Sequence, residues 1–190
     1  MKKLLFTVLF ICTFSITYSQ WISTYGTQPG DVNFANAKGN AVTTDAQGNC
    51  YVTGYSYEEA NKNDIVIIKY GTNGEMIWAR SYNGNANMDD EGFGICVDNN
   101  GNVYIVGFAV FTGKSSDVVL LKYSSTGTLI WANQYSSTEG ALQDKGAAIT
   151  VDALGNIYIT GYTTGTDNLK DVFTRKCNEA GTVLWTKTED

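Results

Sequence analysis

Gly101-Asn102-Val103-Tyr104-Ile105-Val106-Gly107-Phe108 is the stretch that decides the fold, because nearly the same residues occur once before it and once after it. The earlier copy, GNCYVTGY, begins at Gly48, and the later copy, GNIYITGY, begins at Gly155. The three copies start 53 and 54 residues apart. A fixed period slightly above about 50 residues is typical of proteins built from stacked repeats, and of propeller blades in particular.

Four further landmarks keep the same spacing and so define a repeating unit. They are Asp45, Asp98 and Asp152; Asp64, Asp117 and Asp171; Gly74, Gly127 and Gly181; and Trp78, Trp131 and Trp185. Chance does not hold so many positions in register twice. The chain therefore consists largely of three copies of one structural unit.

Each unit is predicted to form four short strands separated by turn residues. In the first unit these strands are expected near Ala41–Thr44, Cys50–Tyr55, Asp64–Tyr70 and Met76–Tyr82. The third strand contains the continuous apolar run Ile65–Ile68, which is typical of a strand covered on both faces. We therefore predict an all-β fold, a partial β-propeller of three consecutive four-stranded antiparallel blades. The blades are expected at residues 39–84, 92–136 and 146–190.

The first 19 residues have the features of a cleavable signal peptide. Lys2 and Lys3 precede an apolar stretch from Leu4 to Ile16, and Thr17–Ser19 forms a small-x-small cleavage signal. The apolar stretch is shorter than the roughly 20 residues that a membrane anchor needs, and Ile11 before Cys12 argues against a lipid anchor. We expect a mature chain that begins at Gln20 and is secreted, periplasmic or on the cell surface, without membrane insertion.

Residues 20–38 are expected to hold an outer strand and a loop, because Trp21–Tyr25 matches Trp78–Tyr82. The third unit already has its own fourth strand, and a closed propeller needs roughly four to eight blades. The sequence is thus expected to be the N-terminal part of a longer propeller, or one part of a ring that another chain completes. The unpaired terminal blades would favour self-association.

The units resemble the SBBP repeats, the seven-bladed β-propeller repeats of exported bacterial proteins. The resemblance rests on Val97–Gly107, on Asp117 and Lys122 at the two ends of the third strand, and on Gly127 before the fourth. It extends over nearly all of residues 39–188, although Trp78–Tyr82 departs from the Tyr-Ser-Thr-Tyr-like stretch expected there. The resemblance implies a propeller and an exported location, and it implies no defined activity.

Residues that recur in every unit are interpreted as structural. Asp45, Asp98 and Asp152 precede Gly48, Gly101 and Gly155 by three residues, where a carboxylate can accept backbone N–H bonds and lock a hairpin. Trp78, Trp131 and Trp185 recur at one position per unit and are expected to act as packing wedges. One aspartate per turn does not supply a calcium site, and the quinone-docking pattern of other propellers is absent, so no metal and no cofactor are predicted.

Composition excludes several classes of chemistry. Histidine is absent from the whole sequence, which rules out catalytic Ser–His or Cys–His pairs within it.

The formal charge is −6, and it becomes −8 without the two lysines of residues 1–19, which argues against nucleic acid as a partner. Cys50, Cys96 and Cys177 align with apolar or β-branched positions of the other units, and we expect buried free thiols.

Specificity is expected in the loops that differ between units. In an antiparallel blade the loop between the second and third strands and the loop to the next unit lie at one end, which we call the loop end. The opposite end is the turn end. Tyr57, Glu58, Asp89, Asp90 and Phe111 are the predicted exposed ligand contacts of the loop end.

The leading functional hypothesis is a non-catalytic module that offers its loop end to a protein or glycan. Two alternatives stay open. The chain could be part of a propeller enzyme acting on carbohydrate, with its catalytic residues in further blades, or a structural spacer in a cell-surface protein. In both the ligand-binding and the spacer hypotheses, no catalytic residue is expected within these units.

Overall fold

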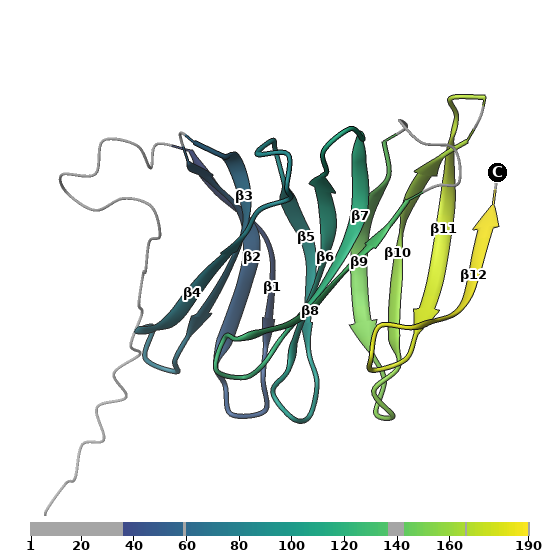
Figure 1. Cartoon of the computed structure of the whole chain (residues 1–190). Coiled ribbons are helices and arrows are strands. Elements are labelled where there is room, and N and C mark those ends of the chain that lie inside the picture. The colour runs from purple at the N-terminus through teal and green to yellow at the C-terminus, as the bar shows by residue number, and fades with distance from the viewer. Residues whose placement is uncertain (1–35, 59, 137–142, 166, 190) are drawn as a thin grey trace, which may run out of the picture.

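The computed structural model describes residues 36–58, 60–136, 143–165 and 167–189. Within them twelve strands form three four-stranded antiparallel sheets. The predicted signal peptide and the predicted strand at Trp21–Tyr25 lie outside the described residues. The expected all-β architecture of consecutive four-stranded blades is confirmed, and Figure 1 shows the three sheets stacked side by side.

Each blade uses four consecutive strands in chain order. The first blade consists of β1 (Ala37–Thr44), β2 (Cys50–Glu58), β3 (Lys62–Tyr70) and β4 (Met76–Tyr82). The second consists of β5 (Glu91–Val97), β6 (Val103–Val110), β7 (Ser116–Tyr123) and β8 (Leu129–Tyr135). The third consists of β9 (Lys145–Val151), β10 (Ile157–Thr164), β11 (Lys170–Cys177) and β12 (Val183–Glu189).

A carboxylate organises the first hairpin of each blade. In the second blade Asp98 Oδ1 accepts the backbone N–H groups of Asn100 and Asn102 at 2.8 and 2.9 Å. Its Oδ2 accepts the Asn102 amide at 2.8 Å and the Tyr104 hydroxyl at 3.0 Å. Gly101 has a φ of 78°, a conformation that glycine adopts at little cost. Asp45 and Asp152 make the same set of bonds in the first and third blades.

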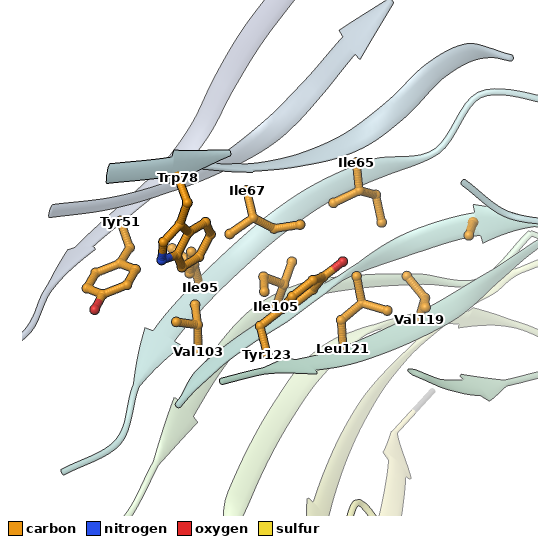
Figure 2. Packing of buried hydrophobic residues seen from close by; sticks show 11 residues of the cluster. Tyr51, Ile65, Ile67, Trp78, Ile95, Val103, Ile105, Val119, Leu121 and Tyr123 are labelled. Carbon is orange, nitrogen blue, oxygen red and sulfur yellow. The ribbon is translucent and has the colours of Figure 1, made fainter. Parts of the chain in front are cut away.

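Two of the three core clusters found among the described residues lie between blades, and the third lies within the first blade. Figure 2 shows Trp78 and Ile67 of the first blade facing Ile105 and Leu121 of the second across the interface between these blades. A second cluster joins the second blade to the third. Because the middle sheet packs on both faces, β7 is buried from Asp117 to Tyr123, as its continuous apolar run predicts.

The tryptophans contact the next blade along the chain. Trp78 donates its indole N–H to the carbonyl oxygen of Ser125 at 3.2 Å. Trp131 takes the corresponding position against Gly181 in the turn between β11 and β12. Trp78 is 8% exposed, whereas Trp185 of the last blade is 40% exposed. The wedge role therefore requires a following blade to cover the ring.

The blades share one polarity, which defines the two ends. The hairpin turns β1–β2 and β3–β4 point to the bottom of Figure 1, and the connections β2–β3 and β4–β5 lie at the top. The first strands β1, β5 and β9 contact one another in sequence and form a shared inner edge. In closed propellers this edge faces the central axis. No helix able to cross a bilayer occurs among the residues that the structure describes.

Candidate functional site

The five residues predicted as ligand contacts differ in how far they reach the surface. Glu58 and Asp89 are exposed at the loop end. Tyr57 is half-buried at the end of β2, and its backbone N–H donates to the carbonyl of Asn36 at 3.1 Å. Phe111 is half-buried and packs against the core between the first two blades. Only Glu58 and Asp89 are therefore fully open to a ligand.

The prediction that Asp90 is an exposed ligand contact is wrong, because this residue is 0% exposed. Its carboxylate accepts the backbone N–H of Val110 at 2.8 Å and that of Gly84. Its own N–H donates to the carbonyl of Asn63 in the preceding blade at 2.7 Å. Asp144, which precedes β9, repeats this arrangement by bonding to Ser116 and Thr164. Asp90 joins adjacent blades, and its recurrence 54 residues later as Asp144 was the overlooked signal of a structural role.

Acidic side chains gather where β3 begins. Asp64 is 2% exposed, and no hydrogen-bond partner for its Oδ1 lies within the described part of the chain. Burial raises the pKa of Asp64 to about 6, the hydrogen bond from Asn61 lowers it, and the nearby Glu58 raises it further. Burial likewise raises the pKa of Asp90 to about 6, against the backbone hydrogen bonds that lower it. Even so, no group of three or more metal-ligating side chains is found among the described residues.

The aspartates that open the third strands form no ion pair with the lysines five residues later on the same strand. Residues five apart in a strand point to opposite faces. Asp117 instead accepts the Ser136 hydroxyl at 2.9 Å, and its carboxylate lies 3.8 Å from Lys114. Lys122 reaches the next blade and pairs with Glu179 at 2.9 Å.

A cavity of about 370 Å³ opens at the loop end. Its apolar wall consists of Met88, Phe108, Val110 and Tyr162. Its polar wall consists of Asp89, Lys114, Ser115, Ser116 and Gln143. Asp89 is thus the one predicted contact residue that lines it. Two other cavities lie elsewhere, one beside the turn between β11 and β12 and one on the open face of the third blade.

Near the loop end, each inner strand carries a charged residue opposite an aromatic residue of the neighbouring strand. The three pairs occupy the same repeat position and are Lys38 with Tyr55, Glu91 with Phe108, and Lys145 with Tyr162. Directly opposed residues of antiparallel strands project to the same face. Two of the three aromatic residues, Phe108 and Tyr162, also line the cavity.

A bulge in each inner strand adds one more variable side chain. The bulge residues are Asn40, Phe93 and Ala147. Asn40 donates to the Glu91 carboxylate and to the carbonyl of Gly92, both at 2.9 Å. Phe93 stacks on Phe108 with ring centroids 6.0 Å apart. Bulges commonly redirect side chains near functional sites.

The inner edge was missed by sequence reasoning, which looked for variation only in loops. Its signal was present, because a single repeat position holds Lys38, Glu91 and Lys145, and another holds Asn40, Phe93 and Ala147. Strand positions that are fixed by the fold but vary in chemistry are candidates for recognition.

Lysines concentrate around the cavity. Lys145 Nζ lies 3.2 Å from the centroid of the Phe93 ring, and Lys170 Nζ lies 3.9 Å from that of Tyr162. Burial lowers the pKa of Lys145, the Glu91 carboxylate raises it, and the positive charges of Lys170 and Lys38 lower it further. The arrangement places lysine ammonium groups over aromatic rings at the loop end, on a chain whose net charge is −6.

Comparison with known families identifies the repeat. Residues 130–170 match the family model described as SBBP, beta-propeller repeat. This segment runs from β8 to the start of β11 and so covers about one repeat. The resemblance predicted from the sequence is confirmed for this segment. No curated protein matches the chain.

One solved structure illustrates the fold. It is the crystal structure of a protein of unknown function from Bacteroides caccae, with a TM-score of 0.51 and 12% sequence identity. The match covers 82% of this chain and 47% of that protein, so the chain spans about half of its structural neighbour. At this identity the similarity concerns the fold alone.

Proposed function

We propose that this chain is an exported, non-catalytic β-propeller repeat module that binds a protein or glycan ligand at its loop end. The supporting observation is the cavity of about 370 Å³ at the end where the units differ in sequence. Ligand sites in proteins are concave and combine apolar walls with a few polar groups. This cavity combines both, and it is lined by residues of the second and third blades together with Met88 and Asp89, which precede β5.

The chemistry of the turn end contrasts with that of the loop end. The first hairpin turn of each blade repeats the same aspartate-centred hydrogen bonds there, for instance those of Asp45 and Asp98. Such a surface offers the same features in each blade. The loop end instead brings together unrepeated residues such as Asp89, Lys114 and Gln143. Recognition of one particular ligand is better supplied by an unrepeated set.

Export is the second component of the proposal. Its support is the sequence pattern of residues 1–19 and the exported proteins in which SBBP repeats are found. Mass spectrometry of the N-terminal peptide of the protein isolated from outside the cytoplasm is expected to show a start at Gln20, as glutamine or as the pyroglutamate that it forms. Recovery from the cytoplasm with Met1 still attached would contradict it.

Binding is tested with a printed oligosaccharide array and two matched double variants. Asp89→Ala/Lys114→Ala changes exposed cavity residues without altering the net charge. Gln47→Ala/Asn99→Ala changes exposed residues of the turn end in the same way. We expect the first variant to lose about tenfold or more in affinity for the bound oligosaccharides, and the second to match the wild type. Equal loss in both, or no oligosaccharide bound, would contradict glycan binding at the loop end.

A further inference from the structure

Three lysines lie on or beside the cavity at the loop end. Lys114 lines it, and Lys145 and Lys170 surround Tyr162, one as its cross-strand partner and the other over its ring. The acidic neighbours are Asp89 on the wall, Asp117, whose carboxylate lies 3.8 Å from Lys114, and Glu91 beside Lys145. One oxygen of Glu91 already accepts a hydrogen bond from Asn40.

The positive charges are held close together although they repel one another. Burial is the main cause that lowers the pKa of Lys145; the Glu91 carboxylate raises this pKa, and the positive charges of Lys170 and Lys38 lower it. Repulsion between like charges weakens with distance and with solvent screening. An anion placed among them would relieve the repulsion, so the cluster favours a negatively charged ligand.

Aromatic rings fix where two of the ammonium groups lie. The Nζ atoms of Lys145 and Lys170 lie over the rings of Phe93 and Tyr162, within the range of cation–π attraction. A lysine held in this way loses less conformational freedom when a ligand binds. The positive surface is therefore partly preorganised.

The cavity wall also includes two aromatic side chains. Phe108 and Tyr162 come from the equivalent position of β6 and β10 in adjacent blades, and both line the cavity. Sugar rings pack their C–H faces on aromatic side chains, while their hydroxyls bond to polar groups such as Gln143 and Ser116. Aromatic walls with hydroxyl and amide groups fit a sugar better than an extended acidic peptide, which would use paired backbone groups at a sheet edge.

We infer that the loop-end cavity binds an anionic oligosaccharide, with Lys145 and Lys170 neutralising its charged groups and Phe108 and Tyr162 packing against its rings. This inference rests on the proposed function and specifies the ligand class of the same site. The anionic group is a uronate carboxylate or a sulfate ester, which share the charge that the lysines recognise.

Calorimetric titration with named probes tests the inference. The probes are trigalacturonate for carboxylates, a κ-carrageenan tetrasaccharide for sulfate esters without carboxylates, cellotetraose as a neutral sugar and a hexaglutamate peptide as a non-sugar anion. We expect one or both anionic sugars to bind at least about tenfold more tightly than cellotetraose and hexaglutamate, and more weakly as salt rises. Which anionic sugar binds identifies the source of the charge.

Variants of the charged residues give the second part of the test. Lys145→Gln and Lys170→Gln are each expected to weaken binding of the anionic sugar about fivefold or more. Lys187→Gln on β12 removes the same charge from an exposed position outside the cavity and should have no effect. Glu91→Gln keeps an oxygen for Asn40 while removing the negative neighbour of Lys145, so binding should tighten about twofold or more.

The outcomes separate this inference from the broader proposal. Equal or tighter binding of cellotetraose would overturn the anionic ligand and leave a glycan site at the loop end. Tighter binding of hexaglutamate would overturn the sugar. Binding that responds to Gln47→Ala/Asn99→Ala on the turn end, or no binding of any probe, would overturn the inference and the proposed function together.

Discussion

The indole ring of Trp78 lies directly against Gly127 of the next blade, so closely that a Cβ built on Gly127 would come within 2.9 Å of the ring. Trp78 stands on β4 and Gly127 in the turn between β7 and β8, and the same pairing recurs between Trp131 and Gly181. The repeated tryptophan of one unit thus contacts the repeated glycine of the next unit, and not the glycine of its own unit.

Gly127→Ala is expected to destabilise the protein more than Gly113→Ala. Both glycines have positive φ, 80° and 77°, so both substitutions incur the backbone cost of about 1 kcal/mol. A Cβ at Gly113 meets nothing within 4 Å, whereas one at Gly127 meets the Trp78 ring. Overpacking adds about 1–3 kcal/mol. Urea unfolding of both variants checks this difference, and equal losses would show that the ring does not need the space.

Trp78→Ala and Trp185→Ala should differ strongly although both replace the same repeat position. Truncation of a buried tryptophan typically costs about 3–5 kcal/mol, and Trp78 is 8% exposed. Trp185 is 40% exposed, so we expect about 1 kcal/mol or less for its truncation. Thermal unfolding of the two variants provides the comparison. A large loss for Trp185→Ala would mean that this ring is covered in solution, by a further blade or another chain.

The titration of Asp64 should lower the free energy of unfolding as the pH rises from about 4 to about 6. Burial raises the pKa of Asp64 to about 6 in the folded chain, whereas an unfolded aspartate has a pKa of about 3.9. In that window the folded state holds a proton that the unfolded state has released. The contribution is therefore largest below about pH 4, falls through the window and is constant above about pH 6. Asp90 acts in the same direction.

Asp64→Asn removes this titration, and we expect the variant to gain on the order of 1 kcal/mol relative to the wild type between pH 4 and pH 7. Chemical unfolding at the two pH values measures the gain. Asp89→Asn changes an exposed carboxylate nearby and is the matched control. Parallel pH profiles for wild type and Asp64→Asn would show that Asp64 stays ionised in the folded protein.

The cysteines should react in an order set by burial. Cys177 is 0% exposed, and its Sγ lies 3.6 Å from the Tyr135 hydroxyl. Burial raises the pKa of Cys96 to about 12, and the charge of Asp98 adds to the effect. Since the thiolate is the reactive form, iodoacetamide at pH 8 should modify Cys50 first and leave Cys96 and Cys177 for the denatured chain. Mass spectrometry of the labelled peptides gives the order, and early labelling of Cys177 would contradict the packing.

The repeat could be predicted well from the sequence because each repeated residue makes the same contacts with nearby residues in every unit. The Asp98 hairpin needs only residues up to Tyr104, so its hydrogen bonds follow from the local sequence. The apolar run in β7 likewise shows in the sequence as a strand covered on both faces. Prediction was weaker for Asp90, whose partners Asn63 and Val110 lie 27 residues before it and 20 residues after it. Distant partners of this kind carry no local sequence signal.

The sequence by itself determined the unit, its strand order, its turns and its family resemblance, because these depend on residues close together along the chain. The tertiary structure decided which variable residues meet. Lys145 and Phe93 lie 3.2 Å apart although they belong to different blades and are separated by 52 residues. A strand bulge and the stacking angle of two sheets bring them together, and neither is encoded in one unit alone. The composition of the candidate site therefore depends on how the blades stack, whereas the form of each blade depends on its own residues.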